Sequence, residues 1–275
     1  MIVDFHTHIV PPKIKEKREL YLGRDPFFQT LYSGKATLAT AQDLIESMDR
    51  AGVDVSVVLN LPWASHELCR ETNDYILESL ARYPGRLVGF GMVPLSAGDT
   101  ALKEIERLAE GGARGLGEMR PDVQGFDPEG FRAVAGEAGK RGFILLFHTT
   151  EPVGHLYPGK GAITPDQVYP FLTAFPGVTF VLAHWGGGLP FYSVMPEVGE
   201  ALKNTYVDTA ATRLLYQPAI YPLVGQLLGW DRVLLGSDFP LLAQARCLEE
   251  VQSLRAGREK KTAILGGNAR RLLKL

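Results

Sequence analysis

The amino-acid sequence predicts a (β/α)8 barrel of the TIM type, and two observations carry this prediction. Short runs rich in β-branched and aromatic residues recur along the whole 275-residue chain, and helical patterns lie between them. Strands that alternate with helices build a parallel sheet, and eight such repeats in a chain of this length are typical of a closed barrel. An open, doubly wound sheet is the alternative fold for the same pattern. We see no linker, so we expect one domain over residues 1–275.

The expected strands are apolar over almost their whole length. Runs of this kind indicate strands that are buried on both faces, as in parallel sheets. The eight strands are expected over residues 2–6, 54–60, 86–93, 113–118, 143–148, 178–184, 204–209 and 232–238.

Helical patterns with clear ends follow several of these strands. Thr40 and Asp43 resemble a capping box, the apolar residues after them follow helical spacing, and Gly52 ends the helix. A capping residue followed by proline opens two later helices, because proline fits the first helical position. The remaining signals are Asp99 before a helix that ends at Gly111-Gly112, Asp127-Pro128, and Thr164-Pro165 before a helix that ends at Pro176-Gly177.

The longest gap between expected elements covers residues 9–39. It contains Pro11-Pro12, a charged stretch and the aromatic residues Phe27, Phe28 and Tyr32. Loops of this length are usually functional or mobile. We therefore expect this segment to be a long loop that covers the mouth of the barrel.

Charge and composition exclude several classes of partner. The formal net charge is −2, and the basic residues form no stripe or tail, so neither nucleic acid nor a membrane is an expected partner. No apolar run approaches the roughly 20 residues of a spanning helix, and the first strand leaves no room for a secretory signal. Cys69 and Cys247 lie far apart, which argues against a disulfide framework and suits a reducing cytoplasm.

A histidine pair stands at the end of the first expected strand. His6 and His8 are two residues apart, so on a strand they point to the same side of the pleat. Neutral imidazole is the commonest metal ligand in proteins. The pair therefore indicates half of a metal site, although two polar residues at a strand end are the alternative for so short a motif.

Four further polar residues end later strands. Because the carboxyl ends of barrel strands converge on one rim, these side chains are expected near the histidine pair. Counting back in steps of two reaches apolar residues, such as Leu146, Leu182 and Phe180, which we expect to fill the barrel interior. The four residues are Glu118 on strand four, His148 on strand five, His184 on strand six and Asp238 on strand eight.

The ordered set of motifs resembles the amidohydrolase superfamily. The resemblance is to the amidohydrolase-related branch that includes aminocarboxymuconate-semialdehyde decarboxylase-like enzymes, and it spans essentially the whole chain. It implies a barrel of the metal-dependent hydrolase type. The segments that carry it are His6-Thr7-His8, His148, His184-Trp185-Gly186-Gly187, Gly236-Ser237-Asp238-Phe239-Pro240 and Gly267-Asn268-Ala269-Arg270-Arg271-Leu272.

This resemblance implies a divalent metal, zinc first and manganese or iron as alternatives, with one or two ions per chain. His6 and His8 would bind it, and His148 and Asp238 resemble further ligands. His184 resembles either a ligand to a second metal or the histidine that polarises the substrate and shuttles protons. A set of histidines and carboxylates with an open position fits a catalytic metal.

Glu118 stands where many members with two metals carry a carbamylated lysine. A glutamate at that position resembles nuclease-like branches, in which a carboxylate bridges two ions. The alternative is that Glu118 pairs with Arg120 or another cation of a nearby loop. Asp4 shares a face with His6 and is expected to orient a ligand imidazole, and Asp208 is expected on the rim.

The expected chemistry follows from a metal. A bound cation lowers the pKa of water to about 7, Asp238 would move the proton, and His184 would help to stabilise a developing oxyanion. Arg120 either binds a substrate carboxylate or is a solvated loop cation. Tyr157 and Trp185 either line the pocket or pack within loops, and packing is the favoured role of Trp63.

Three functions are compatible with these residues. The favoured one is a metal-dependent hydrolase of a C–N or C–O bond in a small-molecule amide, lactone or ester. The second is a metal-dependent, non-oxidative decarboxylase of an aromatic or unsaturated carboxylic acid on the same site. The third is a non-catalytic barrel that binds a metal or ligand, which the complete residue set disfavours. The family resemblance also suggests a homodimer.

Overall fold

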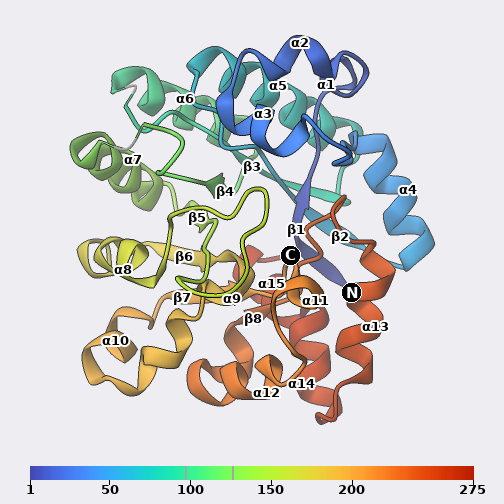
Figure 1. Cartoon of the computed structure of the whole chain (residues 1–275), viewed down its shortest axis with the longest axis vertical. Coiled ribbons are helices and arrows are strands. Elements are labelled where there is room, and N and C mark those ends of the chain that lie inside the picture. The colour runs from blue at the N-terminus through green and yellow to red at the C-terminus, as the bar shows by residue number, and fades with distance from the viewer. Residues whose placement is uncertain (97, 126) are drawn as a thin grey trace.

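The computed structural model describes residues 1–96, 98–125 and 127–275. Eight parallel strands form one sheet in the order β1 to β8, so each strand pairs with the next in the sequence (Figure 1). This arrangement confirms the predicted (β/α)8 barrel. The strands are β1 (Val3–His8), β2 (Val55–Leu59), β3 (Leu87–Gly91), β4 (Gly115–Met119), β5 (Ile144–Phe147), β6 (Thr179–Leu182), β7 (Thr205–Asp208) and β8 (Val233–Leu234).

The segment after β8 closes the barrel against β1. The amide of Phe5 donates to the carbonyl of Leu235 at 2.7 Å, and the amide of His8 donates to the carbonyl of Phe239 at 2.7 Å. The amide of Asp238 donates in turn to the carbonyl of His6 at 2.9 Å. These bonds place Asp238 directly beside the histidine pair.

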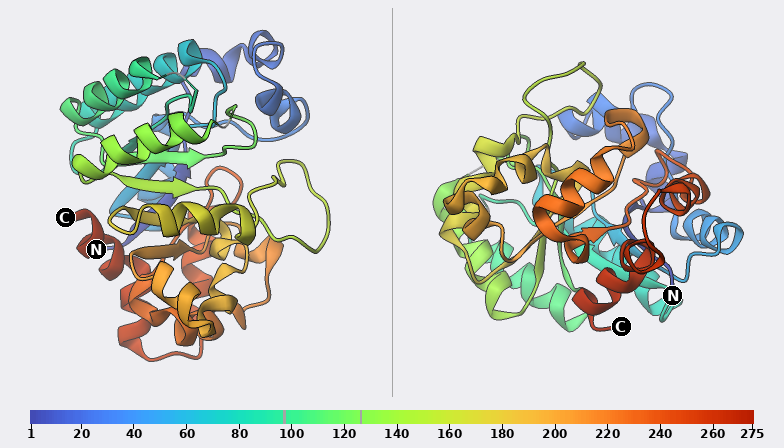
Figure 2. Two further views of the ribbon diagram at one scale, coloured as in Figure 1. Left: turned by 90° about the vertical axis from the view of Figure 1, so that its left-hand side faces the viewer. Right: turned by 90° about the horizontal axis from the view of Figure 1, so that it is seen from below.

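Helices surround the strands, and the two chain ends lie close together (Figure 2). The α-helices are α1 (Pro12–Glu16), α2 (Arg18–Leu22), α3 (Pro26–Tyr32), α4 (Ala41–Ala51), α5 (His66–Arg82), α6 (Asp99–Glu110), α7 (Pro128–Lys140), α8 (Pro165–Ala174), α9 (Ala183–Gly186), α10 (Pro196–Ala201), α11 (Thr212–Leu215), α12 (Ile220–Val224), α13 (Gln244–Ser253), α14 (Arg258–Thr262) and α15 (Asn268–Leu273). No helix in the described part of the chain is long and apolar enough to cross a membrane.

Two of the predicted helix starts have the expected caps. The side chain of Thr40 accepts from the amide of Asp43, whose carboxylate accepts from the amide of Thr40, so the capping box of α4 is confirmed. Asp127 accepts from the amide of Gly130 at 2.8 Å and caps α7. Thr164 precedes α8 without a side-chain cap.

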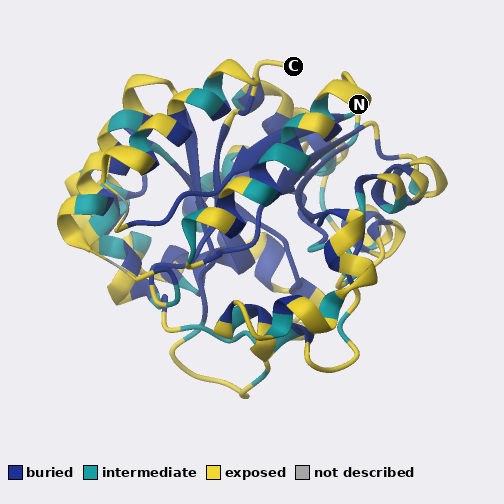
Figure 3. Cartoon of the chain, turned by 90° about the horizontal axis from the view of Figure 1, so that it is seen from above, coloured by how far each residue is buried: buried dark blue, intermediate teal, exposed yellow. Residues whose placement is uncertain are grey.

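The hydrophobic core has two parts, one inside the barrel and one between strands and helices. The buried strands stand at the centre, and the helices expose their outer faces (Figure 3). The inner cluster combines strand residues with Ala269 and Leu273 of α15, which therefore packs against the end of the barrel opposite the polar strand ends. Its strand members include Phe5, Val57, Leu146, Val181 and Leu234.

The segment over residues 9–39 differs from the expected loop, because it contains the short helices α1, α2 and α3. These helices are too short to show a helical period in the sequence. Asp25 caps α3 by accepting from the amide of Phe28 at 2.9 Å. Ile14, Tyr21 and Phe28 are buried and anchor the segment to the barrel.

Strands β6 and β8 are shorter than expected. β6 ends at Leu182, and Phe180 and Leu182 pack in the outer cluster while Val181 and Ala183 face the interior. The expected alternation was wrong here because His184 lies beyond the strand, in a left-handed turn that reorients its side chain. β8 stops at Leu234, since residues 235–238 leave the ladder to bond with β1.

Candidate active site

Six of the predicted site residues come together at the carboxyl ends of the strands. They form two groups, and within each group the potential ligand atoms lie within 4.8 Å of one another. The β1/β8 group consists of His6, His8 and Asp238. The β4–β6 group consists of Glu118, His148 and His184.

The β1/β8 group aims three potential ligand atoms at one another. The Nε2 atoms of His6 and His8 are 3.1 Å apart. Oδ1 of Asp238 lies 3.6 Å from Nε2 of His6 and 3.4 Å from Nε2 of His8. Such convergence of two imidazoles and a carboxylate is the geometry that a cation would use.

Glu118 stands between the two groups. Its Oε1 atom lies 2.9 Å from Nδ1 of His148 and 3.4 Å from Nε2 of His184. Its Oε2 atom faces the other group, 3.8 Å from Nε2 of His6 and 3.5 Å from Nε2 of His8. Glu118 therefore contacts four histidines, whereas Arg120 pairs with Asp122 instead of Glu118.

Asp208 holds a histidine of each group, a role that the sequence analysis did not assign. Its Oδ2 atom lies 2.8 Å from Nδ1 of His6. Its Oδ1 atom accepts from the amides of His184 and Ala210, both at 3.0 Å. Asp208 is the last residue of β7, as expected, and it is fully buried there. A carboxylate in this position orients the imidazole and leaves Nε2 of His6 facing the site.

Asp4 does not orient an imidazole, so that expectation was wrong. The register of β1 shifts between Asp4 and Thr7, and this shift separates the side of Asp4 from that of His6. Asp4 instead accepts from the amide of Ser237 at 2.9 Å and from its hydroxyl at 2.5 Å. It thereby fixes the residue immediately before Asp238.

Two site residues have left-handed backbones. φ is 54° at His184 and 61° at Asp238, a region that non-glycine residues seldom adopt and that often marks functional sites. Neighbouring glycines make room for these turns. A Cβ atom on Gly187 would meet the carbonyl oxygen of Thr150 at 2.4 Å, and one on Gly236 would meet Cβ of His6 at 2.9 Å.

The two site carboxylates are ionised, and two histidines hold protons in response. Burial opposes ionisation, but the charges of His148 and His6 lower the pKa of Glu118 well below its usual value. The hydrogen bond with His8 and the charge of His6 likewise outweigh burial and lower the pKa of Asp238 to about 2. Despite burial, Asp208 raises the pKa of His6 to about 10, and Glu118 raises that of His184 to about 9.

These residues fit a bound cation. Buried carboxylates need a positive partner, and protons on two histidines supply it in the metal-free protein. A divalent ion offers the same charge to the same atoms. Nδ1 of His8 and Nε2 of His148 are also buried without a hydrogen-bond partner in the described part of the chain. Histidines and carboxylates together suit zinc, manganese or iron.

Two of the three predicted substrate-binding residues are buried and already hydrogen-bonded within the protein, and the third is partly exposed. Arg120 is buried, donates to Asp122 at 2.7 Å and to the carbonyl of Gly159 at 2.9 Å, and stacks on Phe27. It is therefore not a solvated loop cation. Trp185 is also buried and donates to Thr212 at 2.8 Å. Tyr157 is partly exposed, with its hydroxyl 3.4 Å from that of Thr150.

Tyr32 of α3 is a site neighbour that the sequence analysis did not identify. Burial raises the pKa of its hydroxyl, and the charges of Asp238 and Glu118 raise it further, which indicates that Tyr32 lies near both groups. The sequence offered one indication of this position, because Tyr32 belongs to the segment over residues 9–39 that was expected to cover the barrel mouth. Trp63 packs on Phe28 with ring centroids 5.1 Å apart, in agreement with the packing role favoured for it.

Comparison with known proteins places this fold and residue set in a family. A family model described as Amidohydrolase matches residues 3–275, and the chain belongs to this family. It is 23% identical to 2-amino-3-carboxymuconate-6-semialdehyde decarboxylase of Dictyostelium discoideum, over 99% of this chain and 91% of the relative. It is 26% identical to 6-methylsalicylic acid decarboxylase of Penicillium expansum, over 86% of this chain and 84% of the relative.

A solved structure shares the fold. The 5-carboxyvanillate decarboxylase of Novosphingobium aromaticivorans, complexed with manganese and 4-hydroxy-3-methoxy-5-nitrobenzoic acid, superposes with a TM-score of 0.80. The alignment covers 100% of this chain and 96% of the other at 18% identity. This likeness shows the shared fold, and the match to the family model over residues 3–275 confirms the family resemblance inferred from the sequence motifs.

Proposed function

We propose that this protein is a metal-dependent, non-oxidative decarboxylase of an aromatic or unsaturated carboxylic acid. The observation that carries the proposal is that two relatives aligned over 86% or more of this chain are both decarboxylases. This is the second of the two enzymatic functions compatible with the sequence. The hydrolase that the sequence favoured is supported by family membership alone.

His6, His8 and Asp238 are the residues we propose for a first divalent ion, because their ligand atoms converge. Glu118, His148 and His184 would complete that site or hold a second ion. When bound, the ion supplies a Lewis acid and a positive charge for an anionic substrate. Manganese is the metal of the solved decarboxylase, so it joins zinc as a metal to test.

In this reaction, a proton replaces the carboxylate group of the substrate. Cleavage of the C–C bond releases CO2 and leaves an electron pair on carbon, which a proton must quench. His184, whose raised pKa lets it hold a proton, is our candidate for giving that proton to carbon. Asp238, an ionised carboxylate of the same site, is our candidate for taking a proton from water or the substrate and passing it on to restore His184. Tyr32 and the helices α1 to α3 would shield the reacting carbon from water.

A metal-dependent hydrolase remains the second candidate, and one observation favours it. Glu118 faces histidines of both groups at 2.9 to 3.8 Å, as a carboxylate that bridges two ions would. Two bridged ions suit the activation of water for hydrolysis. The number of ions and the type of reaction must therefore be measured together.

The test is a substrate panel with the full chain loaded with manganese or zinc. Hydroxybenzoic acids and unsaturated carboxylic acids form one half of the panel, and amides, lactones and esters form the other. We expect CO2 release from the acids that is lost in Asp238→Asn. Hydrolysis without CO2 release would overturn the decarboxylase proposal in favour of the second candidate. Absence of bound metal in protein never exposed to a chelator would contradict both.

A further inference from the structure

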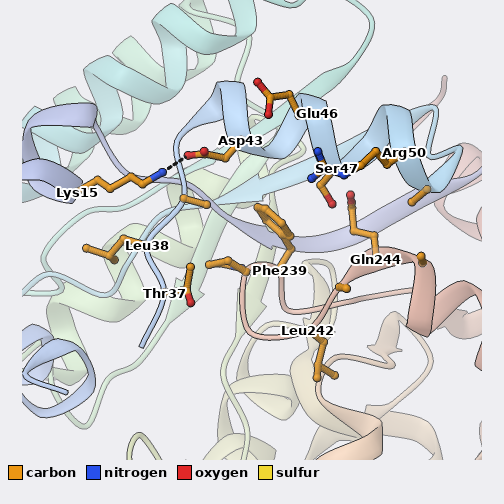
Figure 4. Close-up of a pocket in the computed structure, with 15 residues that line it drawn as sticks. Lys15, Thr37, Leu38, Asp43, Glu46, Ser47, Arg50, Phe239, Leu242 and Gln244 are labelled. Carbon is orange, nitrogen blue, oxygen red and sulfur yellow. Dashed lines mark hydrogen bonds and ion pairs between the residues drawn. The ribbon is translucent and has the colours of Figure 1, made fainter. Parts of the chain in front are cut away.

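Each group of the candidate active site is supported by a buried amide side chain. For the β1/β8 group this is Gln244, which donates to Asp4 at 2.8 Å and lines a pocket between α4 and the segment that joins β8 to α13 (Figure 4). For the β4–β6 group it is Asn73 of α5, which is fully buried. The hydrogen bonds of Asn73 lead to Glu118 through one intervening residue.

The amide of Asn73 uses its whole hydrogen-bonding capacity, which is two donated and two accepted bonds. Nδ2 donates to the carbonyl of Met92 and to Oε1 of Glu104, both at 2.8 Å. Oδ1 accepts from the amide of Met92 at 2.8 Å and from Nδ2 of Asn60 at 2.7 Å. Arg107 donates to both carboxylate oxygens of Glu104, at 2.6 and 2.8 Å. Because an ionised carboxylate accepts hydrogen bonds only, Glu104 fixes the orientation of the Asn73 amide.

Asn73 also determines where β3 leaves the sheet. β3 ends at Gly91, and the last pair between β3 and β4 is Gly91 with Leu116. The next residue, Met92, has both its amide and its carbonyl bonded to the side chain of Asn73. These two main-chain groups are therefore not free to continue the ladder with β4.

Beyond that point, the chain after β2 bonds directly to β4. The amide of Asn60 donates to the carbonyl of Gly117 at 2.8 Å, and the amide of Glu118 donates to the carbonyl of Asn60 at 2.9 Å. The side chain of the same Asn60 is held by Asn73. The main chain of Glu118 is thus fixed to a residue that Asn73 holds in place, while its carboxylate faces the histidines of both groups.

We propose that Asn73 is a positioning residue of the metal site and acts on Glu118 through the main chain of Asn60. By keeping Met92 out of the ladder and holding Asn60, it sets the place from which the Glu118 carboxylate reaches the two groups of histidines. This inference rests on the proposed function only in that it requires a divalent ion at Glu118.

Metal affinity of the full chain tests the proposal, with Zn²⁺ titrated against a chelating dye. We expect Asn73→Ala to weaken binding of the ion at Glu118 about tenfold, the lower end of the usual effect of residues behind a metal ligand. Thr72→Val is the matched control, because Thr72 is buried on the same helix and its hydroxyl donates within that helix, to the carbonyls of Leu68 and Cys69. Full affinity in Asn73→Ala, or an equal loss in both variants, would overturn the proposal.

A double substitution separates positioning from a general loss of stability. In Glu118→Gln, the ion that remains at the β1/β8 group no longer depends on the glutamate. Addition of Asn73→Ala should then leave the affinity for that ion unchanged, because residues that act together have effects that do not add. A further loss of affinity in the double variant would show that Asn73 supports the barrel in general, which contradicts a role through Glu118.

Metal-free crystals give a readout that needs no bound ion. In Asn73→Ala, we expect the Glu118 carboxylate to leave its place 3.5 Å from Nε2 of His8 and the bond between Glu118 and Asn60 to lengthen. If Asn73→Ala does not fold, Asn60→Ala, which removes the side-chain bond to Asn73, takes its place with the same expectation. An unmoved Glu118 would overturn this inference alone, whereas wild-type protein that binds no metal would contradict the proposed function.

Discussion

The two halves of the candidate active site are supported in different ways. In the β1/β8 group, main-chain bonds between β1 and residues 235–239 set the position of Asp238 beside His6, and Asp4 fixes Ser237. In the β4–β6 group, the histidines meet at the side chain of Glu118. The first arrangement is built into the barrel closure, whereas the second depends on one carboxylate. We infer that the β1/β8 group is prepared for an ion, while the other needs Glu118 to hold one.

The largest effect is expected from Asp238→Asn. The amide keeps the shape of the side chain but removes a negative ligand and a proton carrier. General acid–base groups contribute about 100- to 10,000-fold, so we expect kcat to fall at least 100-fold with the fold intact. Steady-state CO2 release and circular dichroism measure the two quantities. Asp99→Asn, at an exposed position, is the control; comparable activity in both variants would remove the role of Asp238.

Glu118→Gln separates the two groups. Loss of the charge should empty the β4–β6 group while the β1/β8 group keeps its ion, so elemental analysis should find less metal but not none. His6→Ala should lose the ion that Glu118→Gln retains. Glu129→Gln changes an exposed glutamate and should leave the metal content unchanged. Full metal content in Glu118→Gln would show that the second group does not depend on this carboxylate.

Asp208→Asn weakens a support that the two groups share. The amide can still contact His6 but no longer offers it a negative charge. Changes of this kind behind a metal ligand typically cost 10- to 100-fold in metal affinity, and we expect a loss in that range. Competition with a chelating dye measures the affinity. Unchanged affinity would limit Asp208 to a structural role in the turn at His184.

Hydrophobic periodicity and strand ends account for the features that the sequence predicted correctly. They identified the barrel and all six residues that meet at its mouth, because polar residues at the ends of apolar strands stand out. Features that depend on local backbone geometry were missed. A register shift in β1 places Asp4 and His6 on different sides of the strand. A left-handed turn at His184 ends the alternation, so the facing of the β6 residues could not be counted back from this histidine. The role of Asp208 depends on contacts with residues distant in sequence, which no local pattern reveals.

The smallest effect is expected from Ser237→Ala, which tests whether barrel closure alone prepares the β1/β8 group. The substitution removes two bonds of the hydroxyl, one donated to Asp4 and one accepted from the amide of Phe239. It keeps the bond from the amide of Ser237 to Asp4 and the main-chain bonds between residues 235–239 and β1. A buried bond to a charged acceptor predicts a loss of about 1–3 kcal/mol in the free energy of unfolding, measured by urea denaturation. Metal content should stay as in the wild type, because Asp238 still bonds to the carbonyl of His6. Loss of the ion would mean that the side-chain bond to Asp4, rather than the closure, positions Asp238.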